Sequence, residues 1–90
     1  MAQKFIITYT DGRPADEAAM TMRAMCKAEQ IMAREGMTAT NDSINATMRA
    51  LHCSLRFSGK TQQPYDEWLD SVDDVEAVTP EADAEAGPLD

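Results

Sequence analysis

Ninety residues allow one small domain, whose core buries a smaller share of the chain's surface than the core of a larger protein does. The net charge of −8 comes from one end, because residues 65–90 carry ten Asp and Glu side chains and no Lys or Arg. This distribution disfavours nucleic acids and anionic membranes as partners, since both are bound by clustered basic side chains.

The first expected element is a short strand over residues 4–10 (KFIITYT), which is rich in aromatic and β-branched residues. Asp11-Gly12 follows it as a strong turn signal. No second strand pattern comes next, because Pro14 leads into a run rich in Ala and Met. The strand therefore needs a partner for its backbone hydrogen bonds, and self-association through its edge is a reasonable expectation.

Two longer helices are expected next. The first should run from about Ala15 to Glu35 and end at Gly36, a residue suited to a helix cap. Its apolar surface, in which methionine is frequent, is wider than a helix packed on one side requires. The second should begin near Asn41 and stop at Ser58, and it carries apolar residues on two opposite faces. We expect the second helix to be sandwiched, either within its own domain or between that domain and another chain.

A third, short helix is expected to start near Pro64 and to carry Val72 and Val75 on its apolar side, opposite a row of acidic residues. The last residues are mostly Ala, acidic residues and Pro, a composition that predicts disorder. We therefore predict a mainly α fold, in which residues 1–77 form a three-helix domain with one short N-terminal β-strand and residues 78–90 form a disordered acidic tail.

No catalytic or metal site is predicted, so we expect a protein that is not an enzyme and uses no cofactor. His52 is the only histidine, and no second Cys or His pair completes a tetrahedral zinc site with it and Cys53. Cys26 and Cys53 each lie among apolar neighbours and are expected to be reduced core residues. No apolar run approaches the roughly 18 residues of a membrane span, and no leader pattern opens the chain, so we expect it to stay in the cytosol.

Non-catalytic binding to another protein is the function that this pattern favours. Seven methionines are many for ninety residues, and flexible thioethers suit surfaces that bind varied apolar partners. Trp68 and Leu69 either close the core or touch the partner. The residues that we predict to contact a partner are Met22, Met25, Met32, Ala46, Ala50, Phe57, Trp68 and Leu69.

Residues 65–70 (YDEWLD) and 72–76 (VDDVE) form an aromatic-Asp-Glu-Trp-Leu run followed by a Val-x-x-Val-Glu ending. This arrangement resembles the end of the small tail assembly chaperones of long-tailed, siphovirus-like bacteriophages, particularly those that infect actinobacteria. The order of parts also resembles that family, with Ala50-Leu51 in the middle helix, and the resemblance covers about residues 4–76.

The resemblance implies a chaperone that binds the long, apolar, helical tape measure protein, keeps it soluble and helps to recruit the tail tube protein during virion morphogenesis. It implies action in the host cell cytoplasm and absence from the mature virion. Such families commonly make a longer form by ribosomal frameshifting.

A hypothesis of another class stays open, in which the acidic C-terminal third mimics nucleic acid and blocks a basic DNA-binding protein. A mimic should lose its partner steeply as salt rises, whereas a chaperone that holds apolar helices should not.

Overall fold

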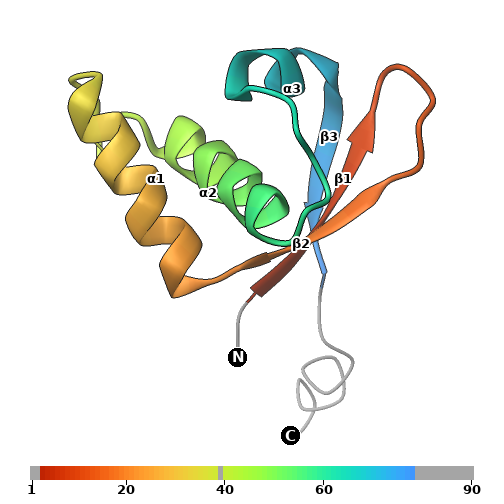
Figure 1. The fold of residues 1–90 in the computed structure, drawn as a ribbon, viewed down its shortest axis with the longest axis horizontal. Coiled ribbons are helices and arrows are strands. Elements are labelled where there is room, and N and C mark those ends of the chain that lie inside the picture. Colours follow the sequence, from red (N-terminus) through yellow and green to blue (C-terminus); the bar gives the residue numbers. More distant parts are fainter. Residues whose placement is uncertain (1–2, 39, 79–90) are drawn as a thin grey trace, which may run out of the picture.

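The computed structural model describes residues 3–38 and 40–78 of the chain. Within these residues three helices lie on one side of a three-stranded antiparallel sheet (Figure 1). The elements in chain order are β1 (Gln3–Tyr9), β2 (Asp16–Met20), α1 (Met22–Arg34), α2 (Ser43–Phe57), α3 (Tyr65–Ser71) and β3 (Val72–Ala77). The fold is therefore α/β, and the prediction of a mainly α fold with a single strand is wrong.

The predicted N-terminal strand is confirmed as β1, which lies in the centre of the sheet with strand order β2-β1-β3. Both of its neighbours are antiparallel and come from the same chain. In the register of the sheet, Phe5 lies opposite Ala18 of β2 and opposite Ala77 of β3. The backbone groups of β1 are thus paired on both edges, and the strand does not need a second molecule for its hydrogen bonds.

Residues 16–20 form β2 instead of the first turns of the predicted helix from Ala15. The Ala-rich composition favours a helix only weakly, and pairing with the otherwise unsatisfied backbone of β1 overrides that preference. Ala18 is buried against the core and Asp16 accepts a hydrogen bond from the Tyr9 hydroxyl at 2.6 Å. The helix starts only after Thr21, whose Oγ1 accepts a hydrogen bond from the Ala24 N–H at 3.1 Å.

The third predicted helix is also shorter than expected, because residues 72–77 leave it and form β3. Thr10 N–H donates to the Ser71 carbonyl at 2.8 Å, so pairing with the end of β1 begins at the last residue of α3. Val72 and Val75 then face the core from an extended backbone, a conformation that β-branched side chains favour. Val72 and Val75 are three residues apart, a spacing that places both side chains on one face of a helix. The same spacing is possible in β3 because the pairing register with β1 shifts between Thr8 and Tyr9.

The core lies between the sheet and the two helices α2 and α3. Ile7 of β1, Leu51 and Leu55 of α2 and Trp68 of α3 are fully buried and pack together. The prediction of a second helix from about Asn41 to Ser58 is confirmed by α2, with its first residue at Ser43.

On the side of α2 away from the sheet lies α1, which buries Ala24, Ala28 and Met32 (Figure 1). Helix α2 is therefore sandwiched within its own domain, which was one of the two arrangements that its apolar faces predicted. Among the described residues, no helix is long and apolar enough to span a membrane. The tail predicted to be disordered lies outside the described residues except for Val78.

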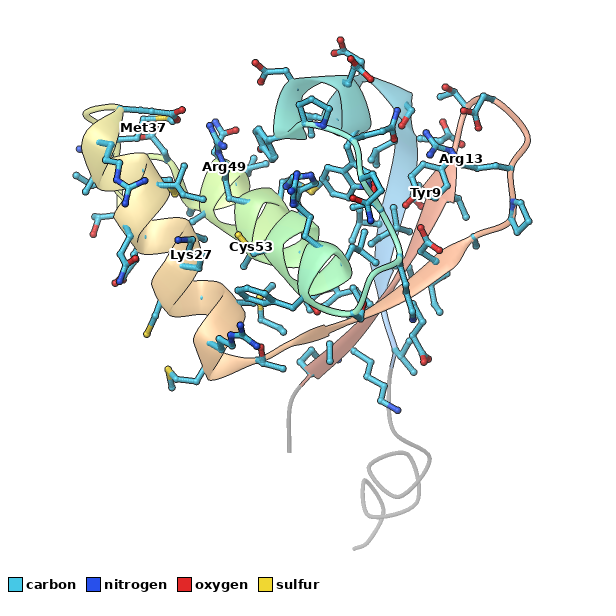
Figure 2. The ribbon with its side chains drawn as sticks, in the orientation of Figure 1. Tyr9, Arg13, Lys27, Met37, Arg49 and Cys53 are labelled. Atoms are coloured by element: carbon cyan, nitrogen blue, oxygen red, sulfur yellow. The ribbon has the colours of Figure 1, made fainter. Side chains whose placement is uncertain are left out.

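A chain of hydrogen bonds ties the hairpin between β1 and β2 to α3. The indole Nε1 of Trp68 donates to the Tyr9 hydroxyl at 3.1 Å, and that hydroxyl donates to Asp16 Oδ2 at 2.6 Å. The Arg13 guanidinium lies 4.1 Å from the centre of the Tyr9 ring and donates to Gln63 Oε1 at 3.0 Å (Figure 2). Burial and the hydrogen bond to Asp16 raise the pKa of Tyr9 to about 12.

This network predicts a loss of stability in alkali. An unfolded tyrosine ionises near pH 10, so the stabilisation from neutral Tyr9 is fully present below about pH 10 and is lost as the pH rises towards its folded pKa of about 12. Burial raises the pKa of Tyr65 as well, and the chain has two tyrosines in all. In an alkaline titration, tyrosinate absorbance should therefore appear together with loss of circular dichroism. A folded protein whose tyrosines both ionise near pH 10 would contradict this prediction.

Candidate functional site

The two residues that were considered for a zinc site, His52 and Cys53, are buried on α2. No group of three or more His, Cys, Asp or Glu side chains within residues 3–38 and 40–78 is placed to hold a metal ion. Cys26 is exposed on α1, whereas Cys53 is a buried free thiol on α2. His52 is buried too, with Nε2 2.8 Å from the Gln63 carbonyl oxygen. Burial lowers the pKa of His52, so its imidazole is neutral near pH 7 and donates to Gln63 as a packing residue.

A hollow with apolar walls lies between α1, α2 and the end of β2. Its volume is about 320 Å³. Met25 and Ala28 of α1 form one wall and Met20, the last residue of β2, lies on the other side. Ala46 and Ala50 of α2 lie between them. The small side chains on α2 leave room above that helix that its neighbours do not fill.

A second hollow of about 320 Å³ continues along α2 towards the sheet. Ile44 and Met48 of α2 face Phe5 of β1 and Val75 of β3 across it. Thr47 lines both hollows, so the two meet at this residue. We call the combined surface the apolar groove, and the residues that define it are Phe5, Met20, Met25, Ala28, Glu29, Ser43, Ile44, Ala46, Thr47, Met48, Ala50 and Val75.

The groove exists because α1 packs on α2 and stands off from the sheet. Large apolar side chains at its rim are consequently left in water: Ile44 is 81% exposed and Met25 is 38% exposed. Covering Ile44 completely would contribute about 1.5–3 kcal/mol, and covering the smaller exposed part of Met25 would contribute less. Among the described residues that line the groove, Glu29 is the one with an ionisable side chain. A ligand for this surface is therefore held by burial of apolar area more than by charge.

Three of the predicted contact residues, Met25, Ala46 and Ala50, line the groove. Ala50 is itself buried and forms part of the floor. Met22 is exposed near the start of α1 but does not line the groove. Phe57 is 41% exposed at the other end of α2, where the Arg23 guanidinium lies 3.8 Å from the centre of its ring. The predicted set therefore does not form one continuous surface.

The other three predicted contact residues belong to the interior. Met32 is buried between α1 and α2, and Trp68 is fully buried in the main core. Leu69 is partly buried and packs against the same core. Of the two roles considered for Trp68 and Leu69, the structure places both in core packing.

Sequence reasoning missed the side of the groove that the sheet supplies. Phe5, Met20 and Val75 reach it from three different strands, two of which were predicted to be helical. Ile44 and Met48 share the α2 face that also carries the core residue Leu51, and neither was among the predicted contact residues. One feature of the sequence could have indicated the groove: the apolar face of α2 that carries Ile44 and Leu51 is longer than the part of the helix that the sheet covers.

Comparisons with protein-family models, with curated proteins and with solved structures found no match to this chain.

Proposed function

We propose that this protein is a non-catalytic tail assembly chaperone of a long-tailed bacteriophage, which binds the tape measure protein, keeps it soluble and helps to recruit tail tube subunits. The observation that carries the proposal is the apolar groove, with Ile44 and Met25 exposed at its rim. The resemblance of residues 65–76 to such chaperones supplies the identity of the client. The groove supplies the means of binding.

The client surface that fits the groove is one apolar face of an α-helix. The two hollows share Thr47 on α2, so one client helix that crosses this residue would reach both of them. A helix is about 10 Å across with its side chains and presents apolar residues at intervals of three and four. Those residues would contact Met20 and Met25 at one end and Ile44 and Met48 at the other. This mode of binding, a helix in a hydrophobic groove, relies on apolar anchors along one face of the client.

The distribution of charge is compatible with a solubilising role. The exposed acidic side chains of α3 and β3 do not line the groove and stay in water when a client fills it; they are Asp66, Glu67, Asp70, Asp73, Asp74 and Glu76. A complex that carries this surplus of negative charge repels other copies of itself. The protein therefore combines an apolar contact surface with a charged exterior.

Methionine methyl groups offer a direct map of the contact. The full chain, labelled at its seven methionine methyls, would be titrated with a synthetic peptide from an apolar helix of the tape measure protein. The signals of Met20, Met25 and Met48 should shift, because these side chains line the groove. The signal of Met37, which follows the end of α1 and does not line it, is the internal control.

A peptide of equal length with its apolar positions changed to Asp should leave all of the signals in place. Shifts confined to Met22 and Met37 would place the client elsewhere on the molecule. No shifts at concentrations where the peptide is soluble and helical would contradict the groove as a client site.

A further inference from the structure

A different face of the α1–α2 pair carries a basic cavity that the client groove does not include. Lys27 of α1 and Arg49, Cys53 and Arg56 of α2 line it, and Figure 2 labels the first three of these residues. Its volume is about 320 Å³, within the range of small-molecule sites. Three of the eight Lys and Arg side chains of an acidic protein therefore gather around one hollow.

The charge around this cavity is only partly neutralised. Glu35 pairs with Arg49, whereas neither Lys27 nor Arg56 forms an ion pair in the described part of the chain. Three cations and one carboxylate leave two positive charges in excess. Lys27, Arg49 and Arg56 each oppose the rise in the pKa of the Cys53 thiol that burial causes, as expected if their charges converge on the same space.

One of the three cations is held in place before any ligand arrives. The Arg49 guanidinium lies 3.9 Å from the centre of the Tyr65 ring and pairs with Glu35. Its Nε is buried and has no hydrogen-bond acceptor among the described residues. Ordering a long side chain in advance removes much of the entropy cost of binding an anion. Asp66 follows Tyr65 but is exposed and does not line the cavity.

The remaining walls are apolar or aromatic. Ile31 and Phe57 lie beside the basic side chains, and the neutral His52 and Tyr65 close the cavity. From this combination we infer a binding site for a phosphate monoester that carries an aromatic ring. A phosphate monoester has a charge of about −1.5 to −2 near neutral pH, which matches the excess of positive charge. The ring would contact Ile31 and Phe57. This site does not depend on the proposed chaperone function.

Calorimetric titration of the full chain tests the inference with phenyl phosphate, inorganic phosphate and adenosine monophosphate as probes. Phenyl phosphate should bind about tenfold more tightly than inorganic phosphate, because only the former buries a ring. Tighter binding of the nucleotide than of phenyl phosphate would assign a nucleotide as the ligand. The reverse order would assign an aryl phosphate. The amide signals of Cys53 and Tyr65 should shift in both cases.

Variants distinguish binding of a phosphate in this cavity from a general attraction of anions to positively charged side chains. The double variant Lys27→Ala with Arg56→Ala should weaken phenyl phosphate binding by about tenfold or more. Arg34→Ala removes one positive charge from an exposed position of α1 outside the cavity and should leave affinity unchanged. Lys27→Arg, which keeps the charge, should bind as the natural chain does. Equal affinity for the two phosphates, equal losses in the double variant and Arg34→Ala, or binding without shifts at Cys53 would each overturn the inference.

Discussion

Replacement of Trp68 by Ala is expected to leave much of the protein unfolded at room temperature. Trp68 is the largest fully buried side chain and packs with Ile7, Leu51 and Leu55 from the two layers of the core. Truncating a buried Trp costs about 3–5 kcal/mol, and a domain this small lies near the lower end of the roughly 5–15 kcal/mol that native proteins have in total. The change also removes the donor to the Tyr9 hydroxyl, whose other hydrogen bond holds β2.

Equilibrium denaturation followed by circular dichroism measures this loss of stability. Circular dichroism is needed because the variant has lost the indole whose fluorescence would otherwise report unfolding. Leu69→Ala is the matched control, because Leu69 is adjacent on α3 and only partly buried. Leu69→Ala should lower the free energy of unfolding clearly less than Trp68→Ala does. If Trp68→Ala lowered the free energy of unfolding by less than about 1 kcal/mol, the core described above would not be the one that holds the fold.

Under the proposed function, Met25→Asp is expected to abolish binding of the tape measure protein without unfolding this protein. Met25 lines the groove and is 38% exposed in the free protein, so a carboxylate there remains solvated until a client covers it. Burying an unpaired charge against an apolar helix costs several kcal/mol, which exceeds the gain from one covered side chain. Ile44→Asp, at the other end of the groove, should have the same effect.

Co-purification with the client in high salt measures this loss. Gln30→Asp introduces the same charge at an exposed position of α1 that does not line the groove, and it should leave the yield of complex unchanged. The circular dichroism of all three variants should match that of the natural chain. A full yield of complex with both Met25→Asp and Ile44→Asp would show that the client binds elsewhere. A loss of folding in Met25→Asp alone would assign Met25 to the core.

Local patterns were sufficient for β1 and α2 because each carries a signal that no neighbour contradicts. The strand pattern of residues 4–10 agrees with burial of Ile7, and two apolar faces on α2 agree with its place between the sheet and α1. The sequence also indicated that β1 lacked a partner. It did not indicate that residues 16–20 and 72–77 would supply one, since Ala18 and Val75 fit helical spacing equally well.

The groove was harder to predict than the fold because its walls come from five separate elements. Met25 and Ala46 were found from helical faces, but Met20 was placed inside the first helix and Val75 inside the third. Their positions depend on the pairing of β1 with β2 and β3, which is a contact between distant residues. Periodicity within one element carries no information about such contacts. The buried position of Met32 likewise depends on how closely α1 approaches α2.

Co-expression of this chain with the tape measure protein encoded beside its gene, followed by purification in high salt, is the most direct test of the proposed function. Under the proposed function, the larger protein becomes soluble and the two proteins elute together at salt concentrations that screen surface charges, because the groove is apolar. An insoluble tape measure protein, or a complex that dissociates as salt rises, would contradict it. The second of these results would favour an acidic protein that mimics nucleic acid.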